Sequence, residues 1–435
     1  MPYDEAAPAL NGDLKGLVAA VRARLARSGV LFRPVSGRPA FPLDPIPRVI
    51  ADADWLQVKN ALAQRVRALN AYVADAYGER RIVREGVVPE RVIETAGHYE
   101  PSMRGVRVPG DLWVGVAGLD LARCEDGEFR VIEDNLLTPS GFGYAVAARD
   151  AILPELDPTP EAMPRSYADL PLLLAGALRA AAPVEREPYL VVLTEPDNAA
   201  RWEHAWAAGA LRVPLVDPAD LRLDGDRVRH GQHAVDVVYR RADADMLDCD
   251  VGRLLEPAVR AGTLGVVNAY GCGVGDDKLA HAYVEDMVRF YLAEEPLIRS
   301  VPTLDLSRRE QLEQALDSFA DMVIKPRAGQ GGMDVLVGPV AEPDEIEATR
   351  KRVRGSPEDW VAQRFVELSQ HATLIDGELS SRHVDLRPFV FMQGPDDARV
   401  LSGGLTRFAI EEGAMVVNTS LNGGFKDTWV VPCDP

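Results

Sequence analysis

Cysteine is scarce in this chain, and long apolar runs are missing. Of 435 residues, only Cys124, Cys249, Cys272 and Cys433 are cysteines, and no two of them form a CxxC pair. This spacing gives no support to a zinc centre or a disulfide framework, and it fits a reducing cytoplasm. No apolar run approaches the roughly 20 residues that a membrane span needs. The N-terminal Met-Pro-Tyr-Asp-Glu has no secretory pattern, so we expect a cytoplasmic protein without membrane contact.

Positive charge is in deficit. The chain has 48 lysines and arginines against 67 aspartates and glutamates, a net charge of −19 at pH 7. Such a balance argues against a nucleic-acid or anionic-membrane surface, which would favour a basic face. It leaves ATP open, because a phosphate site needs only a few local cations and backbone amides. Both the Walker A pattern and the GxGxxG dinucleotide pattern are absent.

What the chain does have is the composition of a globular protein, with 47% hydrophobic and 26% charged residues. The chain is longer than a domain with a single compact core usually is, so two or three lobes are expected. Apolar stripes with a helical period predict N-terminal helices over 13–28 and about 53–77. We also expect a buried strand at 112–118 and a helix over 165–181.

One stretch, residues 131–141, organises the rest. An apolar run reaches Glu133, and Asn135 follows two residues later. On a strand these two side chains point to the same side. A turn at 124–127 predicts a hairpin that returns Asp120 to the same patch. Two carboxylates and an amide oxygen suit Mg²⁺ and leave positions for phosphates and water, although a solvated acidic turn is the alternative.

The continuation Thr138-Pro139-Ser140-Gly141 is a rigid turn that carries two hydroxyls. Thr138 and Ser140 are candidates to hydrogen-bond a reacting carboxylate. A purely structural role in the turn is the equal alternative.

Residues 186–264 predict a Rossmann-like lobe. Apolar strands at 189–193 and 211–216 flank a helix at about 198–209, and a third strand ends at Arg240-Arg241. Such β-α-β units imply a parallel sheet, whose switch-point crevice holds a ligand.

Two lysines stand beside glycine-rich loops. Lys278 follows a loop with glycines at 271, 273 and 275, which predicts either a phosphate cradle or a capped turn. Lys325 ends a strand before the loop Gly329, Gln330, Gly331 and Gly332, a pattern typical of a β-hairpin lid. A lysine at the base of such a hairpin suits nucleotide phosphates, with a protective surface lysine on an edge strand as the alternative for Lys325.

A later strand predicted at 360–367 would lie along an adenine slot. It carries Gln363 and Phe365, with Glu367 placed to meet the ribose. The run 383–390 alternates polar and apolar residues and puts His383, Asp385 and Arg387 on one face.

The order of these motifs resembles the circularly permuted ATP-grasp family, which is similar in fold to glutathionylspermidine synthetase and eukaryotic glutathione synthetase. The resemblance rests on Glu-Asp-Asn at 133–135 with Thr-Pro-Ser-Gly, Val-Gly-Asp-Asp-Lys at 274–278, His383 to Phe389, Gly-Gly-Leu-Thr-Arg at 403–407 and the terminal Gly-Gly-Phe-Lys-Asp-Thr-Trp. It implies an α/β (α+β) ATP-grasp fold, circularly permuted, with a Rossmann-like (pre-ATP-grasp) substrate lobe and N-terminal helices.

The same resemblance implies a division of the chain into four parts. Residues 1–80 would be a helical segment on the core and 81–185 a permuted ATP-grasp segment with the metal hairpin. Residues 186–264 would be the substrate lobe and 265–435 the main ATP-grasp region, with a lid at about 300–340.

The resemblance also assigns roles and a reaction. ATP and Mg²⁺ would be the cofactors. Lys278 and Lys325 would contact the ATP phosphates, and Arg387 and Arg407 would position a phosphate or the acceptor carboxylate. The expected enzyme is an ATP-dependent carboxylate–amine ligase that acts through an acylphosphate on small-molecule substrates. A catalytically silent nucleotide-binding scaffold and an ATP-dependent small-molecule kinase are the alternatives. The substrates are not readable from the sequence, and a homo-oligomer is among the options for assembly.

Overall fold

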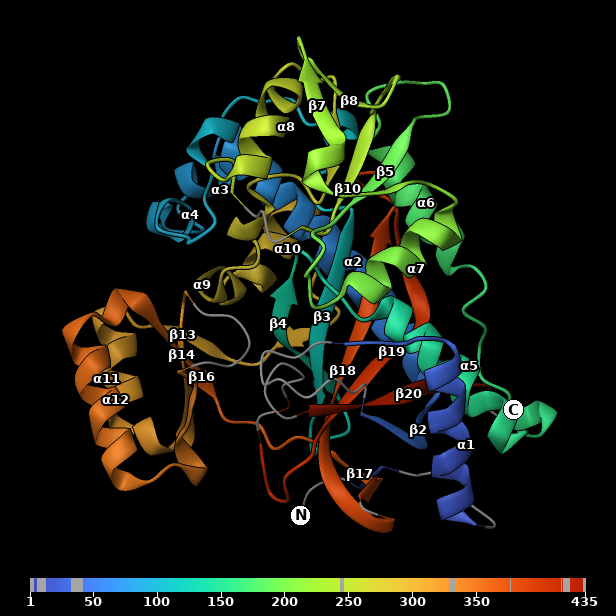
Figure 1. The fold of residues 1–435 in the computed structure, drawn as a ribbon. Helices are drawn as coiled ribbons and strands as arrows, with labels where there is room; N and C mark the ends of the chain where they lie inside the picture. The colour runs from blue at the N-terminus through green and yellow to red at the C-terminus, as the bar shows by residue number, and fades with distance from the viewer. Residues whose placement is uncertain are drawn as a thin grey trace.

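The computed structural model describes residues 4–5, 13–32, 42–242, 246–328, 334–375, 377–415, 417 and 423–432. A large mixed sheet with helices packed beside it forms the main body, and a smaller lobe stands apart on the left of Figure 1. No helix in the described part of the chain combines the length and apolarity that crossing a membrane requires.

The main sheet has nine strands, and its continuous path runs β12-β4-β3-β18-β19-β20-β2. Most neighbours pair antiparallel, but β12 pairs parallel with β4 and β2 pairs parallel with β20. Off this path, β17 pairs with β18, and β1 pairs with β17. The strands are β1 (Asp4–Glu5), β2 (Leu43–Ala51), β3 (Val116–Arg123), β4 (Phe129–Asn135), β12 (Arg299–Ser300), β17 (Gln370–Ile375), β18 (Glu378–Met392), β19 (Ala398–Ala409) and β20 (Gly423–Val431).

The β3–β4 hairpin forms where the turn predicts it. Cys124 and Gly127 close the turn, with Gly127 at φ 81°, a conformation that glycine adopts without strain. Asp120 pairs with Glu133 across the ladder, and Gly118 pairs with Asn135. A register shift follows Asp120, so that its neighbour Leu121 pairs with Val131. The extra residue is a β-bulge, which re-aims the side chains at the end of β4.

The Rossmann-like expectation is confirmed in its topology. Four parallel strands lie in the order β11-β10-β5-β6, and α7 connects β5 to β6. A small antiparallel sheet, β7-β8-β9, lies next to them at the top of Figure 1. These strands are β5 (Leu190–Leu193), β6 (Leu215–Val216), β7 (Leu221–Asp224), β8 (Arg227–His230), β9 (His233–Ala234), β10 (Val237–Arg240) and β11 (Gly265–Val267).

The smaller lobe, drawn in orange in Figure 1, has its own sheet and core. The strands β13 (Thr303–Asp305), β16 (Trp360–Arg364), β14 (Met322–Pro326) and β15 (Leu336–Val337) pair antiparallel in that order. Phe319, Ile324 and Trp360 belong to a hydrophobic cluster separate from the main one. Two helices, α11 (Arg309–Asp317) and α12 (Pro343–Gly355), complete the lobe.

The remaining helices cover the two larger sheets and their connections. Both predicted N-terminal helices are present, and α2 packs on β19 and α10. They are α1 (Leu14–Arg27), α2 (Asp52–Tyr77), α3 (Arg81–Arg84), α4 (Glu90–Glu94), α5 (Phe142–Leu156), α6 (Leu170–Ala180), α7 (Arg201–Leu211), α8 (Asp250–Arg260), α9 (Lys278–His281) and α10 (Val284–Leu292).

Three expected element boundaries were wrong. The strand expected at 112–118 begins at Val116 and runs to Arg123, because the preceding residues are held by side-chain amides outside a ladder. The strand expected at 360–367 ends at Arg364, where pairing with β13 and β14 stops. The helix expected over 165–181 begins only at Leu170, with Pro171 in its first turn.

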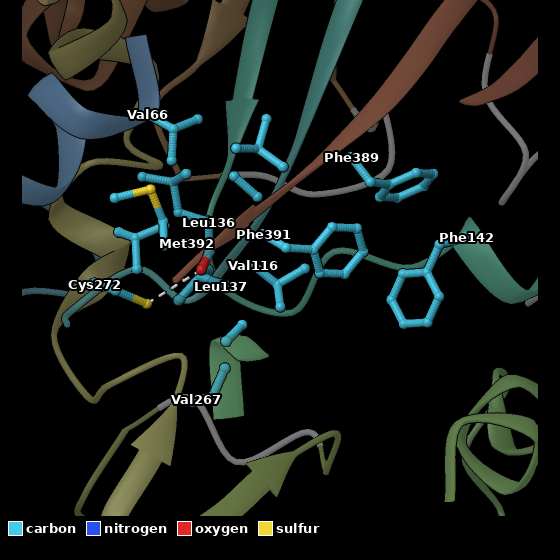
Figure 2. Packing of buried hydrophobic residues seen from close by; sticks show 14 of the residues in the cluster. Val66, Val116, Leu136, Leu137, Phe142, Val267, Cys272, Phe389, Phe391 and Met392 are labelled. Atoms are coloured by element: carbon cyan, nitrogen blue, oxygen red, sulfur yellow. Dashed lines mark hydrogen bonds between the residues drawn. The ribbon is translucent and has the colours of Figure 1, made fainter. Parts of the chain in front are cut away.

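One side chain joins the parallel sheet to the β3–β4 hairpin. Asn268 follows β11 and is 3% exposed. Its Oδ1 accepts hydrogen bonds from the backbone N–H of Gly115 and of Val116, both at 2.8 Å, and its Nδ2 donates to the carbonyls of Val116 and Leu136. Figure 2 shows the packing around this junction, including the Cys272 thiol that donates to the Leu136 carbonyl.

We predict that Asn268→Ala lowers the free energy of unfolding by roughly 3 kcal/mol, because buried backbone donors and acceptors lose their partner. Urea denaturation followed by circular dichroism measures this loss. Gln232→Ala, at an exposed position in a turn of the same region, is the matched control. Equal urea midpoints for the two variants would contradict the structural role.

Candidate functional site

A cavity of about 570 Å³ lies where the main sheet, the Rossmann-like lobe and the orange lobe meet. Elements far apart in the sequence contribute to it, from the β3–β4 hairpin to β18 and β19. Most of the predicted site residues line it: Asp120, Glu133, Asn135, Thr138, Ser140, Lys278, Lys325, Gln363, Phe365, Arg387 and Arg407. The topology therefore brings candidate residues from widely separated segments of the chain to one space.

The predicted metal ligands come from adjacent positions on the hairpin. Glu133 and Asn135 both line the cavity, while Asp134 between them faces the opposite side of β4 and is 3% exposed. Asp120 lies across the ladder from Glu133 and reaches the same cavity. The side chains of β4 alternate as expected, and the two carboxylates and the amide therefore line the same cavity.

The donor set fits a hard divalent cation. Burial raises the pKa of Glu133, but the charges of Lys325 and Lys278 outweigh it and hold that pKa below its usual value. Burial also raises the pKa of Asp120, but the charges of Arg387 and Arg407 outweigh this effect and hold that pKa below its usual value. Asn135 Nδ2 is buried with no hydrogen-bond partner among the described residues. This N–H group can donate to an acceptor such as a phosphate oxygen, whereas a cation would be met by Oδ1 of the same amide.

The protein alone would leave such a cation incompletely coordinated. Within the described ranges, no group of three or more histidine, cysteine, aspartate or glutamate side chains is placed to hold a metal ion. Two carboxylates and one amide match the pattern of Mg²⁺ sites, in which few protein ligands are completed by phosphates and water.

Both lysines border the carboxylates. Lys278 is the first residue of α9, whose N-terminus is capped by the Asp277 side chain. Lys325 is the fourth residue of β14, 7% exposed, with its Nζ 3.5 Å from Glu133 Oε1. Burial lowers the pKa of Lys325, and Glu133 acts against that shift. The alternative of an exposed protective lysine was wrong for Lys325, because β14 is an interior strand.

The glycines before Lys278 do not form a phosphate cradle. A Cβ on Gly273 would meet His98 and Leu137, and one on Gly275 would meet Leu136 and Val73. These glycines allow close packing against the core, and they are not part of the cavity lining. Of the two interpretations kept open for this loop, the structural one holds.

The two arginines are held by aspartates. Arg387 donates to Asp120 through Nε and Nη2 at 2.6 and 2.8 Å. Arg407 bridges two carboxylates, with Nη2 2.9 Å from Asp120 Oδ2 and Nε 2.8 Å from Asp385 Oδ1. Forked contacts of this kind fix the guanidinium planes. In this structure Asp120 therefore orients both arginines at the cavity wall.

Sequence reasoning missed the groups at the substrate-lobe end of the cavity. Arg241, at the carboxyl end of β10, donates to the Ser140 hydroxyl and, at 3.2 Å, to the Thr138 carbonyl. Asn198 and His204 line the same end. The available signal was the Arg240-Arg241 pair at the end of a parallel strand, which is where such sheets bind ligands.

Glu203 on α7 supports this end. It is fully buried, and its Oε1 accepts hydrogen bonds from the backbone N–H of Gly141 and of Gly143, both at 2.8 Å. Burial raises its pKa, although Arg241 opposes the shift. Hydrogen bonds from the turn to the Glu203 carboxyl and from Arg241 to the turn thus fix the segment that carries Thr138 and Ser140.

Asp276 is a further missed group. Its carboxyl accepts hydrogen bonds from the backbone N–H of Leu136 and of Leu137, just after the end of β4 that carries the candidate metal ligands. Burial raises the pKa of Asp276 to about 7, against the lowering effect of those two hydrogen bonds. The carboxyl lines the cavity beside Lys278.

The expected adenine strand is only partly in place. Gln363 donates to the Ile132 carbonyl at 3.2 Å and to Thr303 Oγ1 at 3.1 Å, which joins the smaller lobe to β4. Phe365 lines the cavity, but Glu367 lies outside the lining residues. The expected lid residues Gly329, Gln330, Gly331 and Gly332 fall outside the described residues.

Comparisons with known proteins agree with this architecture. The chain is 40% identical to an uncharacterized protein of Mycobacterium leprae (strain TN), over 99% of this chain and 79% of that protein. It is 42% identical to a Frankia alni protein named "Putative glutamate--cysteine ligase 2-3", over 95% of this chain. The match spans only 50% of that protein, so its name does not by itself assign a reaction to this chain.

A solved structure shares the fold. The glutathione synthetase-like effector of Globodera pallida superposes with a TM-score of 0.65, covering 97% of this chain and 98% of that one at 11% identity. At that identity the likeness concerns the fold alone. The family model described as circularly permuted ATP-grasp type 2 matches residues 47–409. The chain therefore belongs to the circularly permuted ATP-grasp type 2 family.

Proposed function

We propose that this protein is an ATP-dependent carboxylate–amine ligase that forms an amide bond. One observation carries the proposal. In a chain of net charge −19, the cavity is lined by six lysines and arginines against four aspartates and glutamates. Such a local reversal of charge suits a polyanion, and two of the carboxylates lie where a divalent cation would be needed beside its phosphates.

The reaction would begin with phosphoryl transfer. A substrate carboxylate attacks the γ-phosphorus of ATP, the bond to the β-phosphate oxygen breaks, and an acylphosphate and ADP result. Two anions must approach each other, so charge neutralisation is the main requirement. Lys278 and Lys325 would meet the phosphates, and Arg387 and Arg407 would meet the transferred group or the carboxylate. When bound, Mg²⁺ would supply further positive charge at Asp120, Glu133 and Asn135.

Amide formation would follow at the same acyl carbon, on its side toward the Rossmann-like lobe. An amine attacks the acyl carbon, the bond to phosphate breaks, and the amine nitrogen loses a proton. Ser140 and Arg241 border that side and can hydrogen-bond a substrate carboxylate or the developing oxyanion. An acylphosphate reacts readily with water, so its enclosure matters.

The glutamate–cysteine ligase name of the Frankia relative supports an amide-forming reaction, although it belongs to a protein about twice as long. The alternative of a silent scaffold is disfavoured because every predicted metal ligand and both lysines are present in the cavity lining. A kinase is disfavoured because polar groups continue past the phosphate end, at Arg241, Asn198 and His204, where a second substrate would fit.

Product analysis is the direct test. Incubation with Mg²⁺, ATP and pools of carboxylic acids and amines should release ADP and phosphate in equal amounts, together with an amide detected by mass spectrometry. A kinase would give ADP and a stable phosphorylated product without free phosphate. ADP formation that never requires an amine would reject ligation.

We predict that Glu133→Gln lowers kcat at least 100-fold while the protein stays folded, because one metal-facing charge is lost with little change in volume. Glu128→Gln, an exposed change on the same hairpin, is the matched control. The measurement is coupled ADP release with circular dichroism as the folding check. Turnover within threefold of wild type would remove Glu133 from the site.

We predict that Lys325→Met weakens ATP binding tenfold or more. The change removes a buried ammonium group from the end of the cavity that would hold the phosphates, and methionine has a side chain of similar length. Lys351→Met, exposed on α12 of the same lobe, should bind ATP like the wild type. Isothermal calorimetry reports both affinities. Unchanged affinity in Lys325→Met would assign the phosphates to other groups.

A further inference from the structure

Asp134 is the one side chain at the end of β4 that does not face the cavity. It lies between the two candidate ligands Glu133 and Asn135 and points to the opposite side of the strand, where it is 3% exposed. Burial without partners would be costly for a carboxylate. Its partners therefore show what the strand is fixed to.

Two helices hold this carboxylate. Arg65 on α2 donates from Nε to Asp134 Oδ1 at 2.6 Å and from Nη2 to Oδ2 at 2.7 Å. His281, the last residue of α9, places Nδ1 2.7 Å from Asp134 Oδ2. Arg65 is 1% exposed and His281 4%. A fork and a third donor on one buried carboxylate leave it little rotational freedom.

The protonation states follow from these contacts. Burial raises the pKa of Asp134, but Arg65 outweighs it and the pKa is lowered, so the group is a carboxylate. Burial lowers the pKa of His281, which keeps the ring neutral at pH 7. A neutral ring beside a carboxylate carries its proton on Nδ1, so Nε2 is an acceptor.

His281 also borders the nucleotide side. Its Nε2 is buried and has no hydrogen-bond partner among the described residues. The ring lines a small cavity of about 10 Å³ together with Glu133, Lys278 and Lys325. His281 and Lys278 are the two ends of the four-residue α9. One contact thus links the metal-binding strand to the helix that carries a phosphate lysine.

We propose that Arg65, Asp134 and His281 are positioning residues that fix the rotation of β4, so that Glu133 and Asn135 present their oxygens to a divalent cation. The inference rests on the proposed function, in which that cation accompanies ATP. Strand side chains alternate, so holding the middle residue from behind sets the direction of both neighbours. Groups that hydrogen-bond a metal ligand directly commonly contribute 10–100-fold to metal affinity. Here the hold acts through the backbone of β4, so we expect an effect at the lower end of that range.

A purely structural ion pair is the competing explanation. The chain offers a matched pair for comparison, because Arg149 on α5 and Asp427 on β20 form a second buried arginine–aspartate contact. Neither residue lines the cavity. Replacing a buried pair by apolar side chains of similar size usually retains the fold, so both pairs can be exchanged in the same way.

The experiment measures Mn²⁺ binding by electron paramagnetic resonance, without nucleotide, and ATP binding by calorimetry with and without Mg²⁺. The variants are the double change Arg65→Met/Asp134→Leu, the control Arg149→Met/Asp427→Leu, and the pair His281→Asn and His281→Leu. Asparagine keeps a donor near the position of Nδ1, whereas leucine removes it. Thermal denaturation of each variant gives the structural cost separately.

We expect the Arg65/Asp134 exchange and His281→Leu to weaken Mn²⁺ binding tenfold or more. His281→Asn and the Arg149/Asp427 control should stay within about twofold of wild type, whatever their melting temperatures. Metal-free ATP binding should be little changed, because the Asp277 cap of α9 is intact in every variant.

Two results would overturn the proposal: wild-type Mn²⁺ affinity in the Arg65/Asp134 exchange, or an equal loss in the Arg149/Asp427 control. A wild-type protein that binds Mn²⁺ but no ATP would reject the proposed function, and the Mn²⁺ series would still decide the positioning role. A wild-type protein that binds neither would reject both.

Discussion

The site depends on one cross-strand pair, Asp120 opposite Glu133 in the β3–β4 hairpin. Two carboxylates this close repel each other, and each needs cations to remain ionised when buried. Asp120 obtains them from Arg387 and Arg407, and Glu133 from Lys325 and Lys278. The hairpin thus gathers its cations from β18, β19, β14 and α9. Without those cations, burial would favour the protonated form of one or both carboxyl groups. The cavity would then lose the negative charge that a metal ion requires.

The same balance explains why the cavity can bind a polyanion in a strongly acidic protein. Lysines and arginines outnumber carboxylates in its lining, and the carboxylates fix the direction of the arginines without cancelling the excess. A guanidinium held by a fork needs no reorganisation when a phosphate arrives, which is the condition for effective electrostatic stabilisation. The position of the Lys325 ammonium group is less constrained than that of the two guanidinium groups, because its contact with Glu133 Oε1 is 3.5 Å long.

The sequence predicted what local rules decide. Alternation on β4 placed Glu133 and Asn135 on one side, and the turn at 124–127 returned Asp120 to them. The parallel sheet followed from its β-α-β pattern, and the family from the order of short motifs. What escaped prediction was set by tertiary contacts. The glycines at 273 and 275 read equally well as a phosphate loop or as close packing, and only the neighbours Leu136 and Leu137 decide between them. Glu203 stands in unremarkable sequence, and Asp134 and Asp276 lie inside recognised motifs, but the contacts of all three are set by partners distant in the chain.

The permuted order of the motifs along the chain does not alter the geometry of the cavity, because the pairing of strands in the main sheet brings the motifs together. The carboxylates precede every cation of the phosphate end along the chain, yet β3 pairs directly with β18 and β18 with β19. These pairings bring Arg387 and Arg407 to Asp120 across 267 and more residues of chain. The smaller lobe is joined to β4 by Gln363 and to the start of α9 by Arg327, which contacts Asp277 at 3.1 Å. Each cation therefore reaches the hairpin through a contact that does not depend on chain order. A cut and rejoining of the chain outside these pairings would leave the electrostatics of the cavity unchanged, which is the physical condition for a permuted family to keep one site.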